Sequence, residues 1–131
     1  MTDELKKIIF SPQISNVFYK HNWILNIDPK GKFHSYYVGE IANYYLKIYN
    51  HNDKVYFQFT LDIEIPIGKT NELLMLINIA NQNSKEGFFV FDFNARKIKY
   101  NLIKSFSLII EEKSLYEFLK IELNLIAGLF H

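Results

Sequence analysis

Cysteine is absent from the 131 residues, which excludes disulfides, thiolate catalysis and cysteine-based zinc sites and suits a reducing compartment. Glycine occurs only 5 times, and no glycine-rich loop of the kind that cradles phosphates is present. Every apolar run is far shorter than a bilayer span. The first residues include Asp3 and Glu4 and lack the apolar core of a signal peptide. These absences predict a cytoplasmic protein with no membrane segment.

An excess of either charge is also missing, because 15 basic residues face 14 acidic ones. A net charge of +1 lacks the global footprint of a nucleic-acid binder, although it leaves room for a local basic face. The chain is long enough to bury a core without staples, and we expect a single domain over residues 1–131. The 17% aromatic content is high and fits either AT-rich coding bias or a role for aromatic side chains.

Hydrophobic periodicity predicts an α+β fold with the order helix, three strands, helix, two strands, helix. Hairpin connections favour a mostly antiparallel five-stranded sheet with helices packed on one face. Residues 33–43 fit an irregular or edge strand, and residues 104–112 resist assignment. The expected elements are a helix to about residue 20 that is kinked or broken at Ser11-Pro12, strands at 23–28, 44–49 and 55–64, a helix over 73–80 capped by Thr70, strands at 88–93 and 97–102, and a helix from Ser114.

Two of the expected helices carry more apolar surface than one small sheet can bury. Residues 73–80 are apolar except for Asn78, and the stripe of the last helix, over 115–129, is broader than one helical face. A helix that is apolar nearly all round is buried on more than one side. We therefore expect a homodimer or a helix contact involving Met75, Ile79 and Leu123.

A pattern of apolar, Asn, Gly and aromatic residues runs from the second helix to the last strand: Leu73, Leu74, Leu76, Asn78, Asn81, Gly87, Phe88, Phe89, Asp92, Ile98 and Tyr100. This pattern resembles the YbjN family of bacterial proteins, described as sensory transduction regulators. The resemblance implies a fold similar to that of type III secretion chaperones, which are small α+β proteins that commonly dimerise and bind extended segments of partners. Family members often have Arg where this chain has Asn101, and no catalytic residue comes with the family.

The polar and glycine residues of this motif also have plain structural roles. Gly87 can supply a positive φ between helix and strand. Asn78 and Asn81 can bond to nearby backbone, and Asp92 suits the end of a strand before a turn. We expect this set, with Tyr100, to serve the fold rather than chemistry.

No constellation of reactive side chains predicts catalysis, a metal or a cofactor. The four histidines, His21, His34, His51 and His131, lack the spacing that places metal ligands on one helix face. Asp62 and Glu64 would share the wet face of one strand, where ordinary solvated charges are the simpler interpretation. Residues 85–93 echo an RNA-recognition strand, but one residue is missing between the first two aromatics, so we expect core packing.

An exposed tyrosine set remains as a candidate protein-binding surface: Tyr36, Tyr37, Tyr44 and Tyr56, with burial beneath the sheet or first helix as the equal alternative. The leading hypothesis is a non-enzymatic, homodimeric protein-binding module, chaperone-like or a regulatory adaptor. A nucleic-acid-binding regulator that uses sheet aromatics with Lys97, Lys99 and Lys104 is the second hypothesis. An enzyme or small-molecule sensor with an unrecognised pocket is the third.

Overall fold

Residues 2–39, 43–84, 86–110 and 112–128 are described by a computed structural model of the chain. They form the expected α+β fold, with three long helices and one antiparallel sheet. The elements in chain order are α1 (Asp3–Lys20), β1 (Asn26–Ile27), β2 (Phe33–Val38), β3 (Asn43–His51), β4 (Lys54–Leu61), the 3-10 turn η1 (Ile67–Lys69), α2 (Thr70–Asn83), β5 (Phe88–Asp92), β6 (Lys97–Ser105), the short α3 (Ser107–Ile110) and α4 (Glu112–Gly128).

The sheet has six strands in the order β1-β2-β3-β4-β6-β5, so the expected count of five is wrong. The additional strand is β2, which pairs with β3 over its whole length where an irregular or edge segment was expected. The first expected strand shrinks to the two residues of β1. Its start is lost because the Trp23 amide donates to the Phe18 carbonyl at the end of α1 and is unavailable to a strand ladder.

Helix α1 is continuous through Pro12, so the expected break at Ser11-Pro12 is wrong. Pro12 lies on the exposed side of the helix, where water can satisfy the carbonyl that lacks a donor. The start of α1 is capped by Thr2, whose side-chain oxygen accepts from the Leu5 amide at 3.2 Å.

The β1–β2, β3–β4 and β5–β6 turns lie where polar clusters predict them. Asn52 and Arg96 adopt positive φ values of 55° and 52° in the β3–β4 and β5–β6 turns. Gly31 has a φ of 83° in the β1–β2 turn, a conformation that glycine adopts without strain. Short turns of this kind set the register of the strands that they join.

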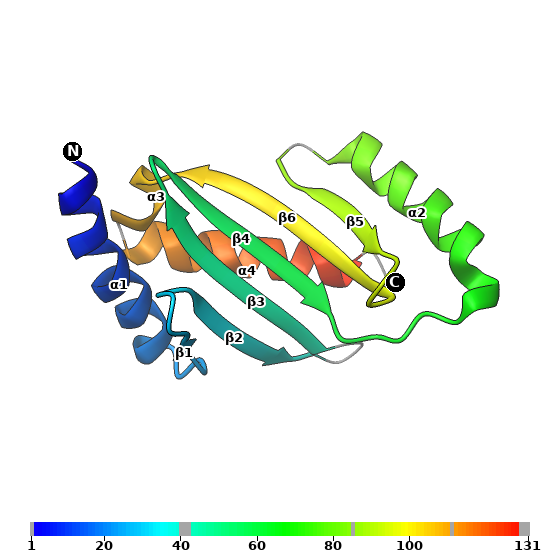
Figure 1. Cartoon of the computed structure of the whole chain (residues 1–131), viewed down its shortest axis with the longest axis horizontal. Coiled ribbons are helices and arrows are strands. Elements are labelled where there is room, and N and C mark those ends of the chain that lie inside the picture. The colour runs from blue at the N-terminus through cyan, green and yellow to red at the C-terminus, as the bar shows by residue number, and fades with distance from the viewer. Residues whose placement is uncertain (1, 40–42, 85, 111, 129–131) are drawn as a thin grey trace.

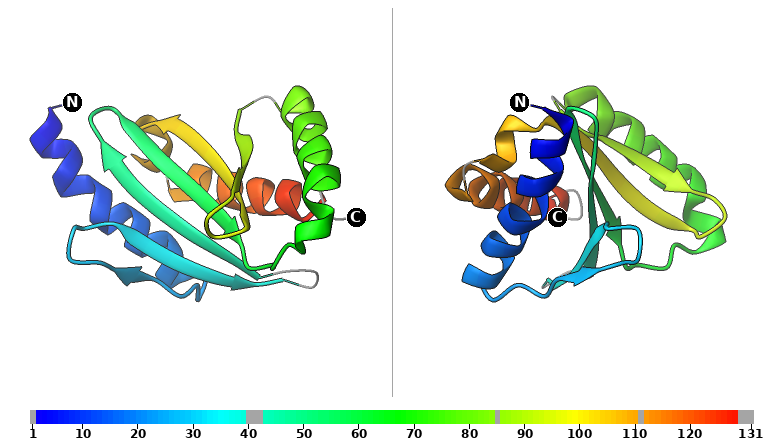
Figure 2. Two further views of the ribbon diagram at one scale, coloured as in Figure 1. Left: turned by 45° about the vertical axis from the view of Figure 1, so that its right-hand side comes forward. Right: turned by 60° about the vertical axis from the view of Figure 1, so that its left-hand side comes forward.

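Helices α1 and α4 cover one face of the twisted sheet, as Figures 1 and 2 show. The core lies between them and the inward side chains of the strands. Phe10 of α1 meets Phe33 of β2 at a ring-centroid distance of 5.5 Å, and Phe57 of β4 meets Phe118 of α4 at 4.8 Å. The opposite face of the sheet, which we call the outer face, turns toward the viewer in Figure 1.

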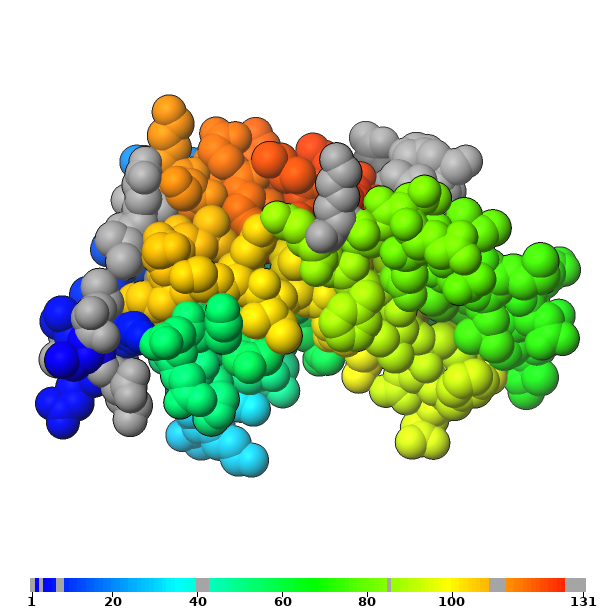
Figure 3. All heavy atoms as spheres, turned by 90° about the horizontal axis from the view of Figure 1, so that it is seen from above, coloured from blue at the N-terminus to red at the C-terminus, as the bar shows by residue number. Residues whose placement is uncertain are grey.

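Helix α2 lies beside the edge strand β5, at the end of the molecule away from α1 (Figures 1 and 3). Leu73 and Ile77 are its buried residues and join the core together with Phe89 and Phe91 of β5. Strand alternation therefore leaves Phe88 and Val90 on the outer face. The burial of Phe89 and Phe91 confirms that this strand packs into the core.

Candidate functional site

The outer face of the sheet combines aromatic, amide and lysine side chains, and no helix of the described residues covers it (Figure 1). Because side chains alternate between the two faces along each strand, every second residue of a strand belongs to the outer face. The register places Tyr36 opposite Tyr45, Lys47 opposite Gln58, and Gln58 opposite Asn101. An open sheet face of this composition is a candidate surface for a ligand.

Two stacked tyrosines mark one end of this face. Tyr49 of β3 and Tyr56 of β4 are cross-strand partners, with ring centroids 4.8 Å apart and an interplanar angle of 2°. The ammonium of Lys32 lies 4.7 Å from the Tyr49 ring centroid, and that of Lys47 lies 5.8 Å from it. Cations over aromatic faces are attracted by the ring quadrupole, so the lysines are held beside the stack.

A hollow of about 260 Å³ adjoins the tyrosine pair on the outer face. Gln58 and Asn101 contribute to it and are joined by a hydrogen bond of 3.0 Å from Gln58 Nε2 to Asn101 Oδ1. Phe88 and Ile103, both about half exposed, add apolar walls. The hollow offers a flat group both stacking surface and amide hydrogen bonds.

A second hollow of about 520 Å³ lies on the other side of Tyr49, between α1 and the β1–β2 turn, and Lys30 and Lys32 line it. Asp28 holds this turn, since its carboxylate accepts from the amides of both lysines and from His34 Nε2 at 2.8 Å. The hydrogen bond from His34, followed by that from the Lys32 amide, lowers the pKa of Asp28 to about 2. Asp28 is therefore ionised at physiological pH and can accept all three hydrogen bonds.

The lysines of the chain divide into paired and unpaired groups. Lys97 lies 3.0 Å from Asp62, Lys99 lies 3.1 Å from Asp92, and Lys104 bonds to Glu86. Within the described part of the chain, no carboxylate lies within 4.0 Å of the Lys30, Lys32 or Lys47 ammonium.

All three lysines of the nucleic-acid hypothesis are ion-paired, which weakens that hypothesis in its original form. Lys104 also lies on the helix-covered side, with its ammonium 5.5 Å from the Phe118 ring centroid. The lysines of the outer face without a carboxylate partner among the described residues include Lys32, in the β1–β2 turn, and Lys47, on β3. The sequence pattern could not show which lysines are ion-paired, because the ion pairs join residues distant in sequence.

The structure separates the four tyrosines that were candidates for a binding surface. Tyr36 and Tyr56 lie on the outer face, with the Tyr36 ring 4.6 Å from that of Tyr45. Tyr37 and Tyr44 pair on the helix-covered face instead, and burial raises the pKa of both hydroxyls. The exposure expected for Tyr37 and Tyr44 is therefore wrong, because the period of two in β2 and β3 turns them toward the core.

Helix α2 carries a second candidate surface. Met75 is 68% exposed and Ile79 53% exposed, and Leu74 and Leu76 flank them with more than a third of their surface accessible. Glu72 is the only charged residue in the helix. Among the described residues, Leu73 and Ile77 are the buried residues of α2, so of the two contacts expected for its other side, a second molecule or another helix, the described part of the chain supplies no covering helix.

The residues expected at a dimer interface differ in how accessible they are to a second molecule. Met75 and Ile79 project from the accessible side of α2. Leu123 of α4 is partly buried and packs against the core of its own chain, so it offers less accessible surface than Met75 or Ile79.

The residues of the expected structural motif serve the fold, with two corrections. Asn81 donates to the Phe89 carbonyl at 2.9 Å and accepts from the Phe89 amide at 2.6 Å, so α2 satisfies the free edge of β5. Asp92 accepts from the Asn94 and Ala95 amides and holds the β5–β6 turn. Hydrogen bonds from the Ala95 amide and from Lys99 lower the pKa of Asp92.

The corrections concern Asn78 and Gly87. The Asn78 side chain is exposed and makes no hydrogen bond within the described part of the chain. Gly87 does not have a positive φ; its missing side chain leaves room for Tyr100, whose Cζ would lie 2.3 Å from an added Cβ.

One ionisable side chain is buried beneath α4. Glu122 is 5% exposed, and its Oε2 has no hydrogen-bond partner among the described atoms. Burial raises the pKa of Glu122, while a hydrogen bond with Tyr100 opposes the shift. Burial, with the nearby Glu122 charge, raises the pKa of Tyr100 to about 12. Neither hollow reaches this pair, so we assign it to stability.

The described residues contain no group of three His, Asp or Glu side chains that could hold a metal ion. His34 bonds to Asp28, and His21 stacks on Tyr116 at 3.6 Å. His51 is the exposed last residue of β3, and His131 lies outside the described residues. None of the helices, within the residues described, has the length and apolar character needed to cross a membrane.

Comparison with known proteins yields no match: no family model, no curated protein and no solved structure is similar to this chain. The resemblance to the YbjN family thus stays a prediction from the sequence. The functional argument depends on the two surfaces described above, the outer face and the accessible side of α2.

Proposed function

We propose that this chain is a non-enzymatic protein-binding module, a chaperone-like or regulatory adaptor, that works as a homodimer formed through α2. The observation that carries the proposal is the accessible apolar side of α2, centred on Met75 and Ile79. The proposed membership of the YbjN family and the proposed likeness to type III secretion chaperones agree with this role, as does a cytoplasmic location.

The occupant that best fits this side of α2 is a second copy of the chain. Met75 and Ile79 lie four residues apart, one turn along the helix, so two antiparallel copies related by a two-fold axis place them against each other. Lysine and arginine are absent from α2, and Glu72 lies in its first turn. An antiparallel contact therefore keeps the two Glu72 carboxylates apart and buries no charge at its centre.

The sheet edge beside α2 is a poorer route to self-association. Asn81 already satisfies both polar backbone groups of Phe89, the second residue of β5, and a paired strand would have to displace it. A helix-to-helix dimer leaves the two hydrogen bonds between Asn81 and Phe89, which we call the Asn81 clamp, intact. It also leaves the outer face of both copies open to a partner.

Sedimentation equilibrium of the full chain tests the dimer. We expect a dimer at micromolar concentration, and Met75→Glu should weaken it by about a hundredfold or more because two carboxylates would be buried at the two-fold axis. The matched control is Tyr19→Glu, which places an acid at an 84% exposed position on α1. A wild-type monomer, or equal weakening by the two variants, would contradict the proposal.

A further inference from the structure

The outer face holds a built site that the dimer proposal does not use. We propose that its tyrosine end, defined as Tyr49, Tyr56, Gln58 and Asn101 with Lys32 and Lys47, binds single-stranded nucleic acid. The site differs from the one expected from the sequence, because it lies at the opposite end of the face from Lys97 and Lys99 and uses other lysines.

The first argument is the flat aromatic surface. The Tyr49 and Tyr56 rings are parallel, are held on adjacent central strands and line the hollow of about 260 Å³. Every nucleobase has a π-face, so base stacking on such rings binds single strands without demanding one sequence. Duplex bases have both faces occupied by their neighbours, so the stack favours unpaired strands.

Amide groups next to the stack supply the second argument. Gln58 and Asn101 use one donor and one acceptor on each other, and both line the hollow. Their remaining amide hydrogens and the Gln58 oxygen have no partner among the described residues and are available to a ligand. Asparagine and glutamine amides match the paired donor and acceptor groups on base edges. Phe88 and Ile103 close the hollow with apolar surface.

The third argument is charge. Lys32 and Lys47 flank Tyr49, Lys30 lies in the adjoining hollow of about 520 Å³, and within the described chain none of these ammonium groups has a carboxylate within 4.0 Å. Tyr49 lines both hollows, so a strand whose base stacks at the tyrosines can continue past it toward Lys30. Lysines beside an aromatic platform follow a phosphate backbone.

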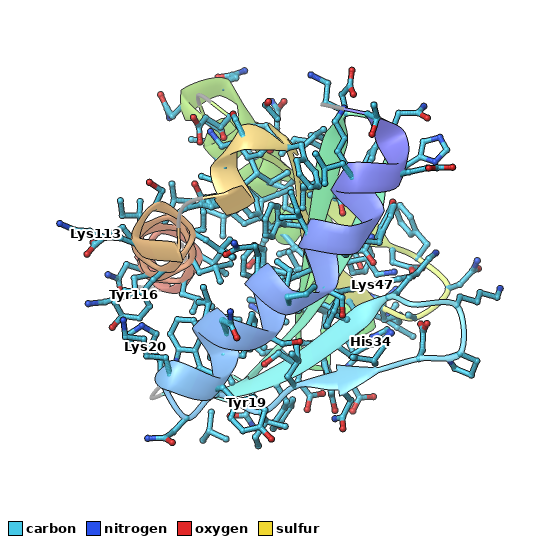
Figure 4. All side chains as sticks on the ribbon, turned by 90° about the vertical axis from the view of Figure 1, so that its left-hand side faces the viewer. Tyr19, Lys20, His34, Lys47, Lys113 and Tyr116 are labelled. Carbon is cyan, nitrogen blue, oxygen red and sulfur yellow. The ribbon has the colours of Figure 1, made fainter. Side chains whose placement is uncertain are left out.

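An acidic polypeptide would satisfy the same lysines, but it has no flat group for the tyrosine stack and no paired hydrogen-bonding edge for the amides. The combination therefore favours a nucleic acid, and the acidic polypeptide becomes a competing outcome of the test. Figure 4 shows that Lys47 and His34 project on the sheet side, whereas Lys113 and Tyr116 lie on α4, on the opposite side. Lys113 is thus a lysine control outside the site.

Fluorescence anisotropy of a labelled oligouridine of about twelve nucleotides, titrated with the full chain, tests the proposal. We expect binding at about 25 mM NaCl with a dissociation constant of about 1–100 µM, and a slope near −2 for log K against log salt if about three phosphates are neutralised. Tyr56→Leu should weaken binding about tenfold through loss of one stacking ring. Tyr56→Phe should retain it, since the ring remains.

A comparison of lysine variants inside and outside the proposed site tests its location. Lys47→Gln should reduce the magnitude of the salt slope by about 0.7, and Lys113→Gln should leave it unchanged. Equal loss in these two variants would overturn the assigned site, and so would equal binding by Tyr56→Leu and wild type with both folded by circular dichroism. Absence of binding at low salt, equal affinity for a duplex, or equal affinity for polyglutamate would overturn recognition of single-stranded nucleic acid.

Discussion

At the scale of single residues, the junction between α2 and β5 is built from contacts that tolerate little change. Gly87 lies against the ring of Tyr100, and Asn81 bonds to both polar backbone groups of Phe89. The missing side chain of Gly87 leaves space for the buried Tyr100 ring. The Asn81 amide supplies hydrogen bonds to a residue of the edge strand. Both residues therefore have measurable structural roles.

Gly87→Ala should lower the free energy of unfolding by about 1–3 kcal/mol, because the new methyl group overlaps the buried Tyr100 ring. Urea denaturation followed by circular dichroism measures the change. Gly68→Ala is the control, since an added Cβ there has no atom within 4 Å, and it should change stability by less than about 0.5 kcal/mol. Equal effects at the two glycines would show that the close approach to Tyr100 does not govern stability.

Asn81→Ala should cost about 1–3 kcal/mol of unfolding free energy, because it leaves the partly buried amide and carbonyl of Phe89 without partners. Asn78→Ala, one turn earlier on the exposed side of the same helix, should be neutral or slightly stabilising because alanine favours helix. Chemical denaturation of both variants provides the comparison. A loss at Asn78 as large as that at Asn81 would contradict the clamp.

At the scale of elements, strong hydrophobic periodicity predicted the helices and strands correctly, whereas segments with weak periodicity were not predicted. The alternation from Val55 to Glu64 predicted β4, which ends at Leu61, and the polar turn residues predicted hairpins, because both signals are local. The sequence left open which face Tyr37 and Tyr44 occupy, because the phase of β2 could not be assigned from its pattern. The stacked tyrosines and free lysines escaped prediction because strand register and ion pairing join distant segments.

The buried Glu122 carboxyl lowers the stability that α4 gains by packing on the sheet. Because its pKa is raised in the folded state, the folded chain binds a proton more tightly than the unfolded chain. Stability from this group is present below the ordinary carboxyl pKa and is lost as pH rises through the raised value.

Glu122→Gln should therefore stabilise the protein at neutral pH by about 1 kcal/mol, since an amide replaces a poorly satisfied buried charge. It should also flatten the decline of stability as pH rises, which denaturation at several pH values measures. Glu117→Gln, at an exposed position on the same helix, should leave the decline unchanged. A wild-type pH profile in Glu122→Gln would contradict the assignment.

At the scale of the whole molecule, the two candidate surfaces lie on different parts of the fold and serve different tasks. The accessible side of α2 lies at one end of the molecule, and the tyrosine end of the outer face lies on the strands beyond β6 (Figures 1 and 3). A dimer through α2 would therefore present two copies of the outer face without covering either tyrosine pair. Self-association and ligand binding can then be removed separately.

A dimer also makes thermal stability depend on concentration, because unfolding releases two chains from one assembly. With an unfolding enthalpy of about 0.7 kcal/mol per residue, the midpoint temperature should rise by about 3 °C for each tenfold increase in protein concentration. Met75→Glu should abolish this dependence while retaining the fold, since Met75 is 68% exposed in the single chain. Differential scanning fluorimetry across two decades of concentration measures both proteins. A concentration-independent wild-type midpoint would reject the dimer, and a Met75→Glu midpoint that still rises with concentration would place the contact elsewhere than α2.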